Sequence, residues 1–145
     1  MLSDANGVPL VVQTGPANQR DEALTLPLLD ALPPLAGPRG GRPRRQPQAL
    51  QGDRGYGFPW TIAAVRRRRI RPLLAPRGGE HGSGLGKTRY VIEQAQSWLG
   101  NCRRLKLCYE RTGKHFQAFH QLAACLVCAT KLGTRDAAGN TRTRF

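Results

Sequence analysis

Acidic residues are scarce in this chain. Asp and Glu together number 9 against 23 Lys and Arg, which gives a formal net charge of +14 at neutral pH. A charge of this size exceeds what solubility requires and indicates a polyanionic partner. Nucleic acid is the first candidate for that partner.

Long apolar runs are also lacking. No stretch stays apolar for the roughly 20 residues that a membrane-spanning helix needs, and no basic amphipathic segment has a clean apolar face. The opening Met-Leu-Ser-Asp contains neither a basic leader nor a long apolar stretch, so the sequence predicts no secretory signal. We therefore expect a cytoplasmic protein that does not bind membranes.

Cysteine is rare too, with only 4 residues in the chain. Without a signal these residues are expected to be reduced thiols. Cys125 and Cys128 have the spacing of zinc ligands, and a zinc site that also uses Cys102 and Cys108 is one interpretation. We favour the other, in which Cys125 and Cys128 are small apolar residues of a helix core, because no turn separates them as in a zinc knuckle.

The hydrophobic content, 39% of 145 residues, is low but sufficient for one domain with a core. We expect this domain to span residues 1–132 and a frayed polar tail to follow at 133–145. Asn6-Gly7 favours a type I′ hairpin turn between a short strand at 1–4 and a β-branched strand at 8–14. The first strand is too short to be a full partner for the second, which indicates that something is missing upstream.

A helix is predicted after the hairpin, over 19–32, with Asn18 as its cap and Pro33-Pro34 at its end. Residues 36–48 are rich in Pro, Gly and Arg and predict an exposed basic loop. Both a solvated linker and a direct DNA contact remain possible for that loop.

The middle of the chain alternates between strand and helix. A strand at 49–53 ends in a sharp exit marked by Gly55 and Gly57, a helix follows at 59–68, and a second strand at 70–74. This alternation predicts an α/β protein whose sheet has mixed strand directions.

The last third is predicted to be helical. After a glycine-rich loop at 77–86, a long helix over 88–107 carries one broad apolar stripe, with Glu93 just beside it. A further helix over 113–131 is apolar almost all round its later turns, so we expect it to be buried. The apolar stripe of the helix over 88–107 consists of Val91, Ile92, Ala95, Trp98, Leu99 and Cys102.

The segment from Gly82 to Thr88 resembles a phosphate-binding Walker loop only superficially. That loop requires a glycine five positions before Gly86, where this chain has His81. Pro76 and Arg77 also interrupt the expected passage from strand to loop. We therefore do not expect nucleotide hydrolysis.

Asp53 and Glu93 are the carboxylates with the most chemical potential. They stand at a predicted strand end and on a predicted helix in a chain rich in arginine. Such carboxylates are natural ligands for Mg²⁺, which prefers oxygen ligands and binds together with substrate phosphates. Two such ions activate the attacking oxygen and stabilise the leaving one in phosphodiester transfer. On spacing alone, two ordinary surface charges are the better explanation of the pair, because a lone Asp and a lone Glu usually lie on the surface.

Flanking motifs give these two residues a context. Asp53-Arg-Gly-Tyr56 resembles the motif around the second catalytic Asp of DDE transposases from bacterial insertion sequences, in the branch named after insertion sequence five. Arg89-Tyr-Val-Ile-Glu93 is similar to the helix around that family's catalytic Glu. Further segments match in the family's order, so the resemblance covers the chain to about Leu132: Asp4 to Leu10, Leu26 to Leu32, Arg69 to Pro72, Trp98-Leu99, Arg103 to Leu105, Tyr109 to Arg111 and Phe119 to Ala124.

The resemblance implies a ribonuclease-H-like fold with a mixed sheet and flanking helices. It implies that three carboxylates hold two Mg²⁺ ions, which drive cleavage and strand transfer of the element's DNA ends. Asp53 and Glu93 would be two of these ligands, while the first strand and its Asp lie upstream in the family and have no counterpart here. The chain is therefore expected to be an N-terminally truncated domain that is inactive alone. Gly57, Gln94 and Gly100 replace polar or basic residues of the family pattern.

Arginines and lysines are the candidates for DNA contact. Clusters at 66–69 and 103–106 can hold phosphates, an interaction that weakens with salt, although a solvated basic face is the alternative for any one of them. We expect His81, His115 and His120 to be ordinary polar or packing residues, because no ligand lies at metal-binding spacing. The candidate contacts are Arg66, Arg67, Arg68, Arg69, Arg89, Arg103, Arg104 and Lys106.

The expected partners are the DNA of the element ends and target, and a second copy or an upstream half of the transposase. The expected place of action is the bacterial cytoplasm, at the nucleoid. Two alternatives stay open: a non-catalytic basic protein that binds nucleic acid, and a decayed reading frame that does not fold stably because its sheet lacks a central strand.

Overall fold

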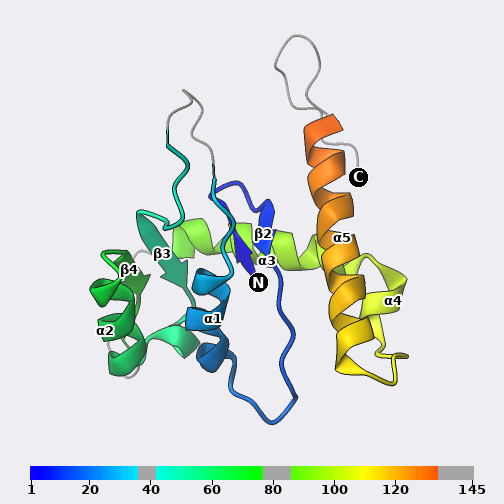
Figure 1. The fold of residues 1–145 in the computed structure, drawn as a ribbon, viewed down its shortest axis with the longest axis horizontal. Coiled ribbons are helices and arrows are strands. Elements are labelled where there is room, and N and C mark those ends of the chain that lie inside the picture. Colours follow the sequence, from blue (N-terminus) through cyan, green and yellow to red (C-terminus); the bar gives the residue numbers. More distant parts are fainter. Residues whose placement is uncertain (36–41, 77–85, 134–145) are drawn as a thin grey trace. The chain divides into compact units, whose positions relative to one another are not determined.

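A computed structural model of the chain describes residues 1–35, 42–76 and 86–133 (Figure 1), with side chains outside 86–89 and 132–133. It contains two compact units. The first comprises residues 1–14 and 91–145, and the second comprises residues 15–90. The predicted loop at 77–86 and the predicted tail at 133–145 lie almost entirely outside the described residues. Each unit is described below by itself.

The first unit begins with a β-hairpin. Strand β1 (Leu2–Ser3) pairs antiparallel with β2 (Pro9–Val11). The Asp4 carboxylate accepts hydrogen bonds from the backbone of Asn6 and Val8, and the Gly7 N–H donates to the Asp4 carbonyl at 3.1 Å. The hairpin was predicted correctly, although its strands are shorter than expected.

The type of hairpin turn differs from the prediction. Gly7 has a φ angle of 81°, whereas Asn6 has a negative one. A type I′ turn needs positive φ at both positions, so the hairpin instead has a three-residue loop with a glycine bulge. The Asp4 carboxylate accounts for this choice because it binds the backbone N–H groups inside the loop.

Helix α3 (Gly86–Gly100) is shorter than predicted. The sequence predicted one helix over 88–107, but the chain leaves the helix after Gly100 and a separate short helix, α4, spans Arg103–Lys106. Cys102 between them is extended, with φ −75° and ψ 107°. Glycine and asparagine at positions 100 and 101 are poor helix formers, which explains the break. The predicted apolar stripe is confirmed at its centre, where Ala95 and Leu99 are buried.

Helix α5 (Gly113–Gly133) has nearly the bounds predicted for it. Ala123 and Val127 form a small core with Leu99, against which Met1 and Trp98 pack. The expectation that α5 is buried all round is wrong, because Leu122 and Leu126 on its other side are 64% and 62% exposed. The apolar periodicity identified the helix, but it did not predict how much of the helix surface is buried by the rest of the unit.

Side chains of α5 bind the backbone of β2 and of the residues after it. The Gln117 amide donates to the Val12 carbonyl at 2.6 Å and accepts from the Thr14 N–H at 2.5 Å. The Cys128 thiol donates to the Pro9 carbonyl at 3.4 Å. These bonds attach the helix to the hairpin within the first unit.

The second unit begins with a short helical segment. A 3₁₀ turn η1 (Asp21–Leu24) leads into α1 (Thr25–Asp30), so the helix predicted over 19–32 is real but shorter. Arg20, not Asn18, occupies the N-cap, and its side chain makes no capping bond. In the predicted basic loop at 36–48, residues 36–41 lie outside the described part of the chain. Arg44, in the described remainder of the loop, forms an isolated antiparallel bridge with Leu35, just before the loop.

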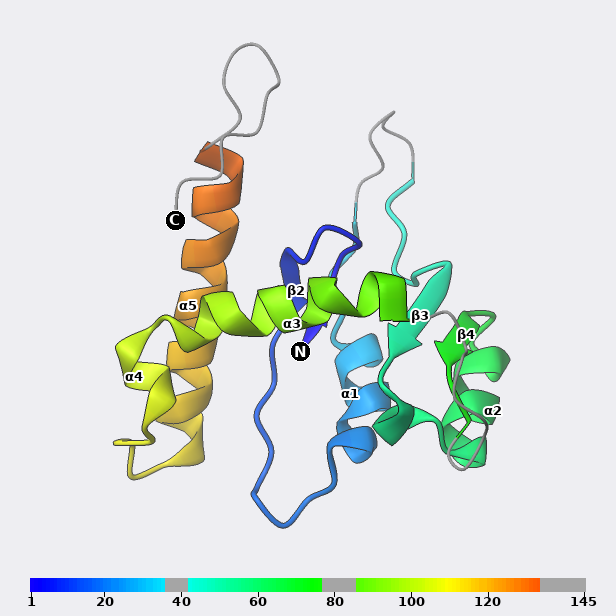
Figure 2. The ribbon, with the colours of Figure 1, turned by 180° about the vertical axis from the view of Figure 1, so that it is seen from behind.

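A parallel strand pair forms the centre of the second unit. Strand β3 (Ala49–Gly52) pairs with β4 (Arg71–Leu74) in the register Ala49 to Arg71, and α2 (Pro59–Arg67) crosses between them. Figure 2 shows α2 beside this pair from behind. The local core consists of buried residues from the two strands, from α2 and from its end: Leu50, Val65, Ile70 and Leu74.

The described strands therefore form one antiparallel pair and one parallel pair, with helices in both units. The predicted α/β class is confirmed at this level. Across the segments that the structure describes, no helix has the length and apolar content to cross a membrane.

Candidate metal and DNA site

Asp53 directly follows β3, as the sequence predicted. Its side chain is exposed, and its Oδ1 atom accepts a hydrogen bond of 2.5 Å from the backbone of Arg54. It thereby caps a 3₁₀ turn, η2 (Arg54–Tyr56). The β3 strand thus presents a carboxylate at its carboxyl end, the edge where α/β sheets commonly bind ligands.

Gly57 fixes the path of the chain after this turn. A Cβ atom at this position would lie only 1.8 Å from the carbonyl oxygen of Ala75, which follows β4. The two backbones therefore touch, and no side chain fits between them. Gly55 differs, since a Cβ atom there would meet nothing within 4 Å. The departure from the family pattern at Gly57 is thus built into the local packing of the motif.

Tyr56 lies half-buried in the same turn. Burial raises the pKa of its phenol above the ordinary value of 10.0, and the nearby carboxylates of Asp21, Asp53 and Glu22 raise the pKa further. The phenol therefore stays neutral and remains a hydrogen-bond donor at physiological pH.

Glu93 lies in the third turn of α3, where its side chain is exposed. It belongs to the first unit, whereas Asp53 belongs to the second. Each carboxylate is therefore placed by its own element. Among the residues that the structure describes, no group of three or more His, Cys, Asp and Glu is arranged to hold a metal ion.

The four arginines at 66–69 have three different environments. Arg66 and Arg67 end α2 and are exposed. Arg68 donates from Nη2 to both carboxylate oxygens of Asp30, at 3.1 and 3.0 Å. Arg69 takes a left-handed conformation with φ 58° and is exposed. In the described part of the chain only Arg68 of these four has an ionic partner.

The second basic cluster is also divided. Arg103 and Lys106 of α4 are exposed, but Arg104 is fixed by a 2.9 Å ion pair with Glu110 and stacks on the ring of Phe119 at 4.7 Å. The Arg104 guanidinium thus already has an ionic and an aromatic partner, and its contact with DNA stays a prediction. The side chain of Arg89, another predicted DNA contact, lies outside the described residues.

Among the residues that the structure describes, histidines and cysteines add no ligand set. His115 is exposed, and a ring nitrogen of His120 lies 3.0 Å from the Phe116 carbonyl, a packing role in agreement with the sequence interpretation. Position 81 is outside the described residues. Cys125 is exposed while Cys128 is half-buried, so the core interpretation of this pair holds only for Cys128.

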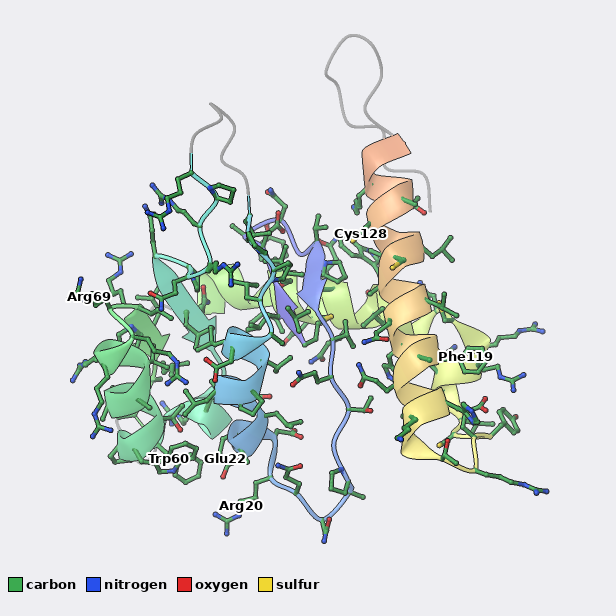
Figure 3. The ribbon with its side chains drawn as sticks, viewed as in Figure 1. Arg20, Glu22, Trp60, Arg69, Phe119 and Cys128 are labelled. Atoms are coloured by element: carbon green, nitrogen blue, oxygen red, sulfur yellow. The ribbon has the colours of Figure 1, made fainter. Side chains whose placement is uncertain are left out.

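An aromatic pair beside the Asp53 turn escaped the sequence interpretation. Trp60 in the first turn of α2 is 48% exposed, and its ring centroid lies 6.4 Å from that of Phe58. The signal was present in the sequence, because Trp60 and Arg67 are seven positions apart and share one helical face. Figure 3 labels Trp60 and Arg69 toward the two ends of α2.

Comparison with known proteins identifies the family. The family model described as a transposase DDE domain matches residues 1–128. A protein of Burkholderia cepacia, named for transposition of insertion sequence element IS402, is 43% identical over 136 residues. That match covers 94% of this chain and 64% of the relative, so the chain spans less than two thirds of the relative's length. No solved structure matches the chain. The resemblance to transposases is thereby confirmed, and the chain belongs to the transposase DDE-domain family.

Proposed function

We propose that this chain acts in DNA transposition and supplies two of the three metal-binding carboxylates of a DDE site, Asp53 and Glu93. The observation that carries the proposal is the position of Asp53. Its exposed carboxylate stands at the carboxyl end of a parallel strand, within the region that the family model matches. Ligands of α/β proteins bind at this end of the strands.

Both residues are suited to a hard divalent cation. Asp53 and Glu93 offer exposed carboxylate oxygens, which Mg²⁺ prefers, in a chain with a net charge of +14 that attracts DNA phosphates. When bound, a metal pair activates the attacking oxygen and stabilises the leaving one. Two carboxylates are an incomplete ligand set, so the proposal includes a third from a segment outside these 145 residues, on the same polypeptide or on another.

A ribonuclease-H-like arrangement is part of the proposal. The order of elements supports it: a hairpin, a helix, a strand ending at Asp53, a helix, a parallel strand and a helix bearing Glu93. The chain would act on the DNA of element ends and target in the bacterial cytoplasm, with a second copy or a further transposase segment as protein partner.

Metal titration tests the carboxylates. We expect Asp53→Asn and Glu93→Gln each to weaken Mn²⁺ or Mg²⁺ binding at least about tenfold in calorimetry, because each removes a charged oxygen ligand. Asp30→Asn is the matched control. It removes one negative charge from an exposed ion pair, which lowers the free energy of unfolding by at most about 1 kcal/mol. Metal binding should stay unchanged.

The competing function is a basic nucleic-acid-binding protein whose acids are incidental. The net charge of +14 favours it, because such a charge attracts nucleic acid without any metal site. If neither Asp53→Asn nor Glu93→Gln alters divalent-ion binding while DNA binding persists, this second function is correct.

A cleavage assay tests the need for a third carboxylate. We expect purified chain to bind DNA without cutting it in Mg²⁺ or Mn²⁺, since two carboxylates hold a metal pair poorly. Cleavage by this chain alone that Asp53→Ala abolishes would contradict the incomplete site while supporting Asp53 as a ligand.

A further inference from the structure

Helix α2 carries an exposed aromatic and an exposed arginine on one face. Trp60 and Arg67 are seven positions apart, and Ala63 and Ala64 lie between them at the intermediate positions of the same stripe. The side chains between the indole and the guanidinium are thus no larger than methyl groups. At 1.5 Å per residue the two ends of this face are about 10 Å apart along the axis.

An adjacent side of α2 faces the core. Thr61 and Val65 are completely buried, and Arg68 on the same stripe binds Asp30. The helix therefore has a fixed orientation, in which Trp60 and Arg67 are left exposed. Phe58 lies beside the indole with an angle of 31° between the two rings.

The charge of this face fits one kind of ligand. Helix α2 contains no acidic residue, and within the described residues neither Arg66 nor Arg67 has a side-chain partner. Arg69 adds a further exposed cation just beyond the helix. An aromatic surface combined with unpaired cations binds unpaired nucleic-acid strands, because bases stack on the ring and phosphates bind the cations.

We propose that the face formed by Trp60, Ala63, Ala64 and Arg67 binds single-stranded DNA, with a base on the indole and a phosphate on the guanidinium. An intact duplex does not suit this face, since neighbouring base pairs cover both faces of each base. The length of about 10 Å corresponds to roughly three base steps of 3.4 Å. The proposal rests on the proposed function only in taking DNA as the ligand.

Fluorescence anisotropy with a labelled single-stranded oligodeoxynucleotide and the matching duplex tests the face. Trp60→Leu, which keeps an apolar side chain but removes the stacking surface, should weaken single-strand binding roughly 5- to 100-fold and leave duplex binding within about twofold. Trp60→Phe should retain most of the affinity. Tyr109→Ala is the matched control, because Tyr109 is an exposed aromatic of the other unit.

The outcomes separate the two proposals. Unchanged single-strand affinity in Trp60→Leu, or an equal loss for both DNA forms, overturns the assignment of this face and points to a protein contact or general charge. A thermal melt by circular dichroism confirms that each variant is folded. If Trp60→Leu behaves as expected but Asp53→Asn leaves divalent-ion binding unchanged, the face stands and the metal proposal fails.

Discussion

Gly57 shows how one residue fixes the position of the candidate ligand Asp53. Its backbone touches the Ala75 carbonyl at the end of the neighbouring strand, so the turn after Asp53 is held against β4. A polar residue in this place, as the family pattern has it, would force the two backbones apart. The carboxylate of Asp53 would then move with the turn that it caps.

Two glycine substitutions in this turn should have opposite outcomes. Gly57→Ala should lower the free energy of unfolding by about 3 kcal/mol, because the added Cβ collides with backbone. Gly55→Ala should change it by less than about 1 kcal/mol, and in the stabilising direction, because the site is open and alanine restricts the unfolded chain. Urea denaturation followed by circular dichroism measures both. Similar losses in the two variants would contradict the close contact at Gly57.

At the scale of the element, the end of α2 has an arginine where glycine is favoured. The Ile70 N–H donates to the Val65 carbonyl at 3.3 Å and the Arg69 N–H to the Arg66 carbonyl at 2.8 Å. This pair of bonds is a Schellman motif, and both Ile70 and Val65 are buried. Arg69 occupies the left-handed position of that motif, which costs an L-residue roughly 1 kcal/mol.

Replacement of that arginine should therefore stabilise the protein. Arg69→Gly is expected to raise the free energy of unfolding by about 1 kcal/mol, since glycine adopts a positive φ without a steric penalty. Arg66→Gly, inside the helix, should lower it by roughly the same amount. Denaturation midpoints of the two variants provide the measurement. A loss of stability in Arg69→Gly would show that the arginine side chain itself contributes more than its backbone strain costs.

At the scale of the whole molecule, charge governs association. The excess of 23 basic over 9 acidic residues predicts DNA affinity that falls linearly on a logarithmic plot against salt concentration. Arg66→Ala and Arg67→Ala should each reduce the slope by about 1 if each holds a phosphate. Arg68→Ala should leave the slope unchanged, because Asp30 already binds this guanidinium. Titrations over a range of salt concentrations distinguish the three, and an equal change in all would indicate a diffuse basic surface.

The run of four arginines also marks the limit of what the sequence predicts. Propensity and periodicity placed β3, α2, β4 and α5 within about two residues, because each has a clear pattern and a clear end. They could not distinguish four identical neighbours. Arg68 is ion-paired, Arg69 is exposed and left-handed, and Arg66 and Arg67 are exposed within the last turn of the helix. The position of the helix end and an acid distant in sequence decide these differences.

For the candidate site, too, the sequence predicted the position of one residue but not its contacts. Family motifs indicated Asp53, and the pattern of the strand placed it at the strand's end, where it lies. The contact of Gly57 with Ala75 joins residues from two different strands' ends, so no local pattern reveals it. The break after Gly100 was visible as two poor helix formers, but the apolar stripe on both sides favoured a continuous helix.

The attachment of α5 to the hairpin affects which edge of the β1–β2 sheet can pair with a further strand. Gln117 and Cys128 occupy backbone groups of β2 and its continuation, and Pro9 within β2 has no N–H to offer. A helix over a strand edge blocks the templated addition of further strands, which protects against aggregation. The edge of β1 has no such cover from Gln117 and Cys128. An incoming strand, from this polypeptide or from a partner, would therefore join the hairpin beside Leu2 and Ser3.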